Sequence, residues 1–161
     1  DFNAYTMAPN SPPHTDEPFR TGAGHIHVGW GSGFRGAAHF GLCCDLVKQL
    51  DAVLFVQSLL WDSDDKRRSL YGNIGAFRPK PYGMEYRPLS NAFLKSQHTQ
   101  RWVFEATKYA VEDFFRGVEY NTDEAVQAMV DLILSGSKPM PRAIRSYMKH
   151  ISRTYGVPSY D

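Results

Sequence analysis

The chain has 161 residues, which is enough for one folded domain but not for several. Its residues are 42% hydrophobic and 14% aromatic, so a folded core is expected and global disorder is excluded. A formal net charge of +1 argues against a dedicated nucleic-acid binder, whose surface is usually strongly basic. The longest apolar-rich run, residues 52–61, is too short to cross a bilayer, so we expect no membrane partner.

The two cysteines, Cys43 and Cys44, are neighbours in the sequence. Adjacent cysteines rarely bond to each other, and two cannot form a disulfide framework. We therefore predict that they pack as small apolar side chains of a helix, which suits a reducing, cytoplasmic compartment. The chain opens on Asp1 rather than Met, so we expect a processed product or one part of something larger.

The first elements follow from proline content and hydrophobic periodicity. Residues 1–20 are rich in Pro, Asn and Asp, which predicts a loop or an extended segment. Residues 25–28 alternate in polarity between glycines and predict a strand with both of its histidines on one face. Residues 37–50 have helical spacing, and residues 51–61 predict a second, more buried helix.

The middle of the chain is less regular. The charged run 62–68 is interpreted as a helix end and a turn, with Asp62, Asp64 and Asp65 solvated. Glycines and prolines interrupt residues 71–81, which predicts a loop with a short extended piece at 76–78. Residues 84–87 alternate again and predict a strand, which places Glu85 and Arg87 on the same face.

The last third predicts helices at about 91–116, 122–134 and 141–153. Its aromatic residues recur at helical spacing and are interpreted as core or interface: Phe104, Tyr109, Phe114 and Phe115. The whole is a single domain or a fragment, with a sheet-rich part at 1–95 and a helical part at 96–161. Because strands come early and helices late, the expected class is α+β with an antiparallel sheet and packed helices.

Two motifs near the first strand are candidate sites. His25 and His27 alternate on one strand and could present two imidazoles to a metal or a phosphate, although two satisfied histidines at a sheet edge are the simpler explanation. Residues 31–36 match GxGxxG formally, but no hydrophobic parallel strand precedes them and no βαβ pattern follows. A loop that enters a helix is the better interpretation of this glycine-rich run.

A concentration of cations surrounds one acid in the middle of the chain. Glu85 and Arg87 could form a simple surface salt bridge, which would be worth little. Five cations nevertheless fall within about twenty residues, in a Gly/Pro-rich context with few acids: Arg67, Arg68, Arg78, Lys80 and Arg87. That concentration suits an anion with several charges. Mg²⁺ with ATP would use Glu85 as an oxygen ligand and the arginines as phosphate clamps.

Two segments, RTGAGHIHVGWG and YGNIGAFRPKPYGMEYRPLSNAFL, together resemble the phage-encoded carboxylate–amine ligases. This family is related to glutamine synthetase and to the bacterial glutamate–cysteine ligases. The resemblance covers about residues 1–95. It implies the C-terminal portion of a glutamine-synthetase-like catalytic fold in the cytoplasm, or in the host cytoplasm if the protein is phage-encoded. It also implies an ATP-dependent ligation, in which a carboxylate is phosphorylated and an amine then attacks the acyl phosphate.

The resemblance also implies roles for individual residues. His25 and Glu85 match metal ligands, for Mg²⁺ or Mn²⁺. Arg87 matches an arginine that faces the transferring phosphoryl group and the substrate, and Arg78 matches a catalytic arginine of the preceding loop. His27 matches the phosphate-side histidine, and Arg68 matches a loop arginine. These two residues, with Arg78 and Lys80, are assigned to the nucleotide phosphates. Asn91 falls where the pattern continues and is assigned to the substrate.

The match also implies that something is absent. Family members carry an upstream half with further strands and with acidic residues that complete the metal cluster. We therefore expect a fragment or a subunit, with the upstream half as a second chain or missing segment, or an oligomer covering an exposed sheet edge. The expected partners are ATP, a carboxylate and an amine, with a peptide as one form of these substrates. Two alternatives stay open: a non-catalytic structural or assembly protein that keeps the fold, and a guanidino-kinase-like phosphotransferase.

Overall fold

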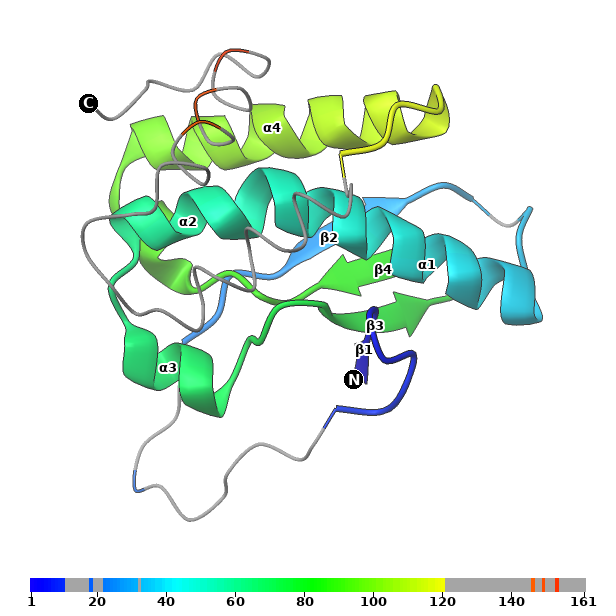
Figure 1. Ribbon diagram of the computed structural model, residues 1–161, viewed down its shortest axis with the longest axis horizontal. Coiled ribbons are helices and arrows are strands. Elements are labelled where there is room, and N and C mark those ends of the chain that lie inside the picture. Colours follow the sequence, from blue (N-terminus) through cyan, green and yellow to red (C-terminus); the bar gives the residue numbers. More distant parts are fainter. Residues whose placement is uncertain are drawn as a thin grey trace.

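The structure is a computed structural model that describes residues 1–10, 18, 22–31, 33–120, 146, 149 and 153. It is a mixed α+β fold, and its described part holds an antiparallel sheet with the strand order β1-β3-β4-β2 (Figure 1). The strands are β1 (Phe2–Asn3), β2 (Ile26–Gly29), β3 (Ala76–Lys80) and β4 (Gly83–Tyr86). The antiparallel sheet and the α+β class are confirmed.

A tight hairpin joins β3 to β4, with Lys80 opposite Gly83. Gly83 has φ +159°, and a Cβ there would come within 2.0 Å of the carbonyl oxygen of Val28, so only glycine lets β2 approach this closely. The predicted extended piece at 76–78 is confirmed, but the strand continues through residues 79–80, where a loop was predicted. Pro79 is tolerated because β1 pairs only with Ala76 and Phe77, so no strand needs an N–H from Pro79.

The predicted helices 37–50 and 51–61 are one continuous helical run. It comprises α1 (Gly36–Leu50), a π-helical segment (Asp51–Phe55) and α2 (Val56–Trp61). No proline, glycine or capping side chain separates the parts, so nothing ends the first helix. Cys43 and Cys44 are free and buried in this run, which confirms their predicted packing role.

The acidic run that follows is only partly solvated. Asp62 is buried, so the prediction of a solvated side chain was wrong there. Asp64 caps the short helix α3 (Asp65–Leu70) by accepting a hydrogen bond from the backbone N–H of Arg67. The predicted helix end and turn is therefore the start of another helix.

The predicted helix 91–116 is interrupted. Residues Asn91–Lys95 form a 3₁₀ turn, and α4 (Gln97–Phe115) begins after Ser96. Ser96 has an extended backbone, and its hydroxyl accepts from the N–H of Thr99, so it acts as an N-cap inside the predicted helix. Helix 122–134 lies outside the described residues, as does helix 141–153 apart from residues 146, 149 and 153.

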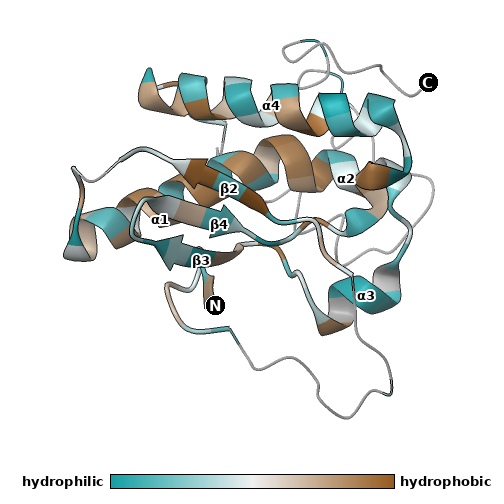
Figure 2. Cartoon of the chain, turned by 180° about the vertical axis from the view of Figure 1, so that it is seen from behind, coloured by the Kyte–Doolittle hydropathy of each residue, from teal (hydrophilic) through white to brown (hydrophobic). Residues whose placement is uncertain are grey.

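The core lies between one face of the sheet and the helices. The run from α1 to α2 covers this face, and α4 packs on α1 and the π-helical segment (Figure 1). The apolar residues of β3 and β4, among them Phe77, Met84 and Tyr86, are fully buried there. In Figure 2, hydrophilic and hydrophobic residues alternate along α4, as in an amphipathic helix. No helix in the described ranges is long and apolar enough to cross a membrane.

The aromatic series of α4 mostly faces outward. Phe104 is 68% exposed, and Tyr109 and Phe115 are also exposed, so these three residues are not core residues. Phe114 packs against the core, as predicted. An interface role for the exposed members stays a prediction.

Candidate active site

The face of the sheet opposite the helices collects the charged side chains. His27 lies opposite Glu85 in the β2–β4 pairing, and Arg78 lies opposite Glu85 in the β3–β4 pairing. Since side chains alternate along strands, Lys80 follows Arg78 on this face. His25 precedes β2 and Arg87 follows β4, and contacts bring both to Glu85. The predicted shared faces, His25 with His27 and Glu85 with Arg87, are confirmed.

Glu85 is the centre of this group. Its side chain is 4% exposed. Its Oε1 lies 2.8 Å from Nδ1 of His25 and also contacts Nη1 of Arg87. Its Oε2 lies 2.8 Å from Nζ of Lys80 and 3.6 Å from Nη1 of Arg78. Both carboxylate oxygens are therefore occupied by donors from the strands and their ends.

Asp1 is a second acid at the edge of this group. Its Oδ1 lies 2.9 Å from Nη2 of Arg78 and accepts a hydrogen bond from Nε of the same arginine at 3.0 Å. Its Oδ2 lies 3.0 Å from Nε of Arg87. Asp1 precedes β1, which pairs with β3, and this pairing brings the acid to the two arginines. A small cavity of about 50 Å³ lies beside Asp1, Tyr71 and Arg87.

Tyr71 connects two members of the group. Its hydroxyl oxygen accepts a hydrogen bond from Nη2 of Arg87 and lies 3.1 Å from Nε2 of His25. The Nδ1 of His25 lies closer to the carboxylate of Glu85, at 2.8 Å, than to Arg87, at 3.3 Å. We therefore assign the proton of the imidazole to Nδ1, which leaves Nε2 to accept from Tyr71.

His27 lies opposite Glu85 in the pairing of β2 with β4, and it is exposed. Its Nδ1 forms a hydrogen bond with the hydroxyl of Tyr82, which belongs to the β3–β4 turn, and the two rings stack. Tyr82 is exposed as well. His27 therefore lies at the solvent-exposed edge of the charged face.

The charges of this face sum to a positive excess. Burial raises the pKa of Glu85, but Lys80, Arg87 and Arg78 outweigh it and lower this pKa to about 2. Burial lowers the pKa of His25, and Arg87 lowers it further, so the imidazole is neutral at pH 7. Two carboxylates, Asp1 and Glu85, thus face three cations. Such a face favours an anion, and its guanidinium groups suit phosphate oxygens.

Three of the residues considered from sequence have other contacts. Arg67 is buried and donates to the carbonyl oxygens of Gly22, Pro88 and Leu89 at 2.8–3.0 Å. Arg68 donates to the carbonyl of Asp62 at 2.7 Å and lies 3.6 Å from its carboxylate. Asn91 is exposed and its side chain lies against Gly22. The structure therefore does not place Arg68 or Asn91 against Glu85.

The match to a family model covers most of this chain. Residues 11–149 match the model of the phage phiEco32-like COOH.NH2 ligase-type 2 family. The chain belongs to this family of carboxylate–amine ligases. No curated protein and no solved structure matches it. The match includes Glu85 and the three cations around it, whereas Asp1 lies outside the matched residues.

Ligases use ATP in general, and the described residues of this chain fit phosphate better than a metal ion. Mg²⁺ is coordinated by about six oxygen ligands, several of them from water. Only His25 and Glu85 were predicted as protein ligands, and the described ranges hold no group of three or more His, Cys, Asp or Glu side chains that could hold a metal. Lys80 and Arg87 also contact the oxygens of Glu85, where they would repel a cation. The metal site is thus incomplete in the residues described.

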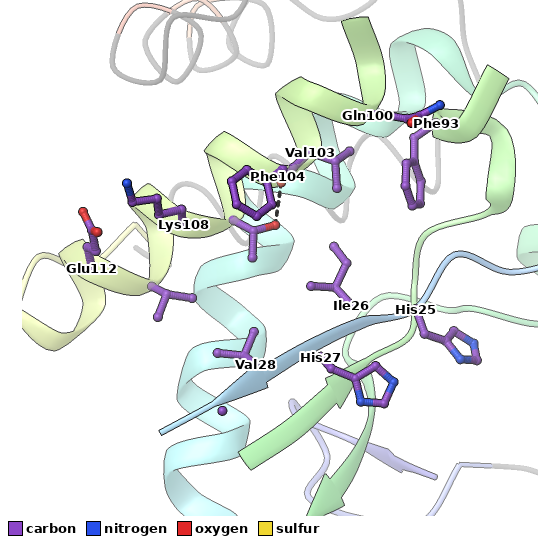
Figure 3. Close-up of a pocket in the computed structure, with 13 residues that line it drawn as sticks. His25, Ile26, His27, Val28, Phe93, Gln100, Val103, Phe104, Lys108 and Glu112 are labelled. Carbon is purple, nitrogen blue, oxygen red and sulfur yellow. Dashed lines mark hydrogen bonds between the residues drawn. The ribbon is translucent and has the colours of Figure 1, made fainter. Parts of the chain in front are cut away.

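A groove of about 590 Å³ lies beside the charged face, between β2 and α4 (Figure 3). Ile26 and Val28 point into it from β2, and Val103 and Phe104 point into it from α4. His25 and His27 project to the other side of the strand. No described strand pairs with this edge of β2, so the predicted exposed sheet edge is confirmed for the part of the sheet described.

Sequence reasoning missed three residues of this region: Asp1, Tyr71 and Tyr82. All three meet their partners through contacts between segments far apart in the chain, and no local pattern predicts such contacts. Tyr71 opens the YGNIGAFR segment, so the motif marked its position without indicating a role.

Proposed function

We propose that this chain is a catalytic portion of an ATP- and Mg²⁺-dependent carboxylate–amine ligase that works through an acyl phosphate. In such a reaction a carboxylate oxygen attacks the γ-phosphorus of ATP and ADP leaves. The amine nitrogen then attacks the acyl carbon, and phosphate leaves. The observation that carries the proposal is the positive face around Glu85 in a chain of this ligase family.

The chemistry explains why such a face is useful. Phosphoryl transfer depends mainly on positioning and on neutralising the charge of the phosphate oxygens. Arg78 is 46% exposed and Lys80 lies beside it, so both can exchange their contacts with Glu85 and Asp1 for phosphate oxygens. We assign His27, Arg78 and Lys80 to the nucleotide and Arg87 to the transferring group and substrate. Arg68 and Asn91 are not part of this proposal because their contacts lie elsewhere.

We further propose that a strand from an upstream half of the fold, as a second chain or another segment, covers the free edge of β2. Gly24 and Trp30 donate their N–H groups toward the β4 side, to Leu89 and Tyr82. By the alternation of an antiparallel ladder, the backbone groups of the odd-numbered residues of β2 point to the free edge. An added strand would pair with them and cover the apolar groove. It would also lie next to His25 and could bring the acidic ligands that the metal needs.

The incomplete metal site supports one alternative, a non-catalytic protein that retains the ligase fold. That protein would bind no nucleotide even when the missing half is supplied. A guanidino-kinase-like enzyme would instead form a phosphoguanidine, whereas a ligase forms an amide together with ADP. Product analysis separates these two reactions.

The deciding experiment is a calorimetric titration of ATP into the chain with and without Mg²⁺. We expect Mg²⁺-dependent binding that Glu85→Gln abolishes, while the thermal unfolding curve keeps its cooperative shape. Glu119→Gln, an exposed residue beyond α4, is the matched control and should bind as the parent chain does. Equal affinity in Glu85→Gln would overturn the assignment of the site. No binding by the parent chain would favour the non-catalytic alternative or a site completed by the partner half.

A further inference from the structure

Arg67 fixes the position of the short helix α3 relative to the charged face. Its guanidinium donates to three carbonyl oxygens, one in the segment that leads to His25 and two in the segment that follows Arg87. Hydrogen bonds from a charged donor are stronger than neutral ones, and this donor is buried. Arg67 therefore holds together α3 and the two segments that carry His25 and Arg87.

Tyr71 follows directly at the end of α3, where it is the C-cap residue. Gly72 comes next with φ +75°, and a Cβ there would meet Nη2 of Arg67 at 2.7 Å. This turn directs the ring of Tyr71 to the site, where the guanidinium carbons of Arg67 and Arg87 lie 5.7 and 5.5 Å from its centroid. Its hydroxyl is thereby placed between His25 and Arg87.

We infer that Tyr71 is a positioning residue of this site, because its hydroxyl ties the imidazole of His25 to the guanidinium of Arg87. The catalytic importance of this contact rests on the proposed function. The contact itself is independent of that proposal. It assigns to Tyr71 a role in holding two site residues in one geometry, with no contact to the reacting atoms required.

The direction of each hydrogen bond follows from the donors available. Arg87 can only donate, so the hydroxyl oxygen of Tyr71 accepts from Nη2. The hydroxyl proton is then free to be donated to Nε2 of His25. Nδ1–H of His25 donates to Glu85, and Nη1 of Arg87 donates to the same oxygen. The four side chains thus form a closed ring in which each partner limits the rotation of the next.

A tyrosine suits this position better than phenylalanine would. Phenylalanine would keep the ring and its contacts with the two guanidinium groups. It would leave Nε2 of His25 without its donor and Nη2 of Arg87 without its acceptor. The imidazole and the guanidinium would then move more independently, and the site would spend less time in the geometry that holds an anion.

The test compares Tyr71→Phe with the parent chain by two measurements. The first is a long-range ¹H–¹⁵N spectrum of the histidine side chains, assigned for His25 with a His25→Gln variant. We expect the ¹⁵N resonance of Nε2 of His25 to shift toward the value of an imidazole nitrogen that accepts no hydrogen bond. The second is the ATP titration, in which affinity should fall about threefold to tenfold, as expected for one lost hydrogen bond.

Two other tyrosines serve as references. Tyr109→Phe removes an exposed hydroxyl on α4, away from the site, and should leave both readouts unchanged. Tyr82→Phe removes the hydroxyl on His27 and should move the resonances of His27 rather than those of His25. This pair separates loss of the specific contact from a general effect of removing a hydroxyl group.

The outcomes separate this inference from the proposed function. An unchanged Nε2 resonance of His25 in Tyr71→Phe would overturn the inference whether or not the chain binds ATP. A shifted resonance with unchanged ATP affinity, in a parent chain that binds ATP, would overturn the positioning role. A parent chain that binds no ATP would favour the non-catalytic alternative or a site completed by the partner half, and the histidine spectrum would still decide whether the contact exists.

Discussion

Two acids on opposite sides of β4 show how the two faces of this sheet differ. Glu85 lies on the outer face among Arg78, Lys80 and Arg87. Asp51 belongs to the π-helical segment against the inner face and is fully buried. It accepts from the hydroxyl of Tyr86 at 2.7 Å and from the N–H of Gly75 at 2.8 Å. Burial raises the pKa of both, yet that of Glu85 falls to about 2 and that of Asp51 rises to about 7.

The difference shows that neutral hydrogen-bond donors lower the pKa of a buried carboxyl group less than charged side chains do. Hydrogen bonds from Tyr86 and Gly75 lower the pKa of Asp51 but do not offset its complete burial. The full charges around Glu85 do offset its burial. The outer face is therefore built to hold charge and to exchange ions, whereas the inner face is built for packing, with one acid tied to neutral partners.

The largest expected effect is on packing at the inner face. Phe77 is fully buried and packs against Phe2 and Phe40 with ring centroids at 6.1 and 5.6 Å. Phe77→Ala should lower the free energy of unfolding by about 3–5 kcal/mol, because it leaves a cavity in the core. Urea denaturation measures this. A loss below about 1 kcal/mol would contradict the assignment of this face as the core.

The second prediction concerns pH. The folded pKa of Asp51 is raised above the unfolded one, so its stabilising contribution is complete below about pH 4 and is lost as the pH rises through about 7. The free energy of unfolding should fall by up to about 1.4 kcal/mol per pH unit across that window. Asp51→Asn should remove this fall, and Asp45→Asn, an exposed residue of α1, should keep it. Urea denaturation at pH 5 and pH 8 gives the comparison, and equal slopes in the parent chain and Asp51→Asn would refute it.

A smaller effect is expected from the partner of Asp51. Tyr86→Phe removes one hydrogen bond and should cost about 0.5–1.5 kcal/mol. Since that hydrogen bond lowers the pKa of Asp51, its loss should also move the pH window of the stability change upward. The same denaturation series across pH measures both effects. A window that stays in place would mean that Tyr86 does not interact with the ionised acid.

The smallest effect on stability is expected on the outer face of β3, the strand that also carries Phe77. Arg78 neighbours Phe77 but is half exposed, so Arg78→Ala should change the free energy of unfolding by less than about 1 kcal/mol. ATP binding should nevertheless weaken, because one of the three cations is removed. Denaturation and calorimetry of the same variant test the contrast. A loss of stability as large as that of Phe77→Ala would remove the distinction between the two faces.

Local periodicity was sufficient to predict which residues share a face wherever polar and apolar residues alternate regularly along a strand. The faces of His25, His27, Glu85 and Arg87 followed from a repeat of two residues, and the structure confirms them. β3 was predicted only in part, as an extended piece at 76–78, because its proline and the nearby glycines are typical of loops. Its pairing with β1 and β4 makes it a full strand. The break at Ser96 was missed because a serine inside a helical pattern is ambiguous until its capping contact is known.

The sequence by itself determined the ligase family, the antiparallel α+β class and the identity of the charged residues near Glu85. Only the tertiary structure separated Arg67, which holds backbone carbonyls, from Arg78, which faces the site. It alone also brought Asp1 and Tyr71 to Arg87. The physical reason is that residue type and spacing fix what a side chain can do and which face of an element carries it. Burial and the partners of a charge depend on segments that are distant in the chain.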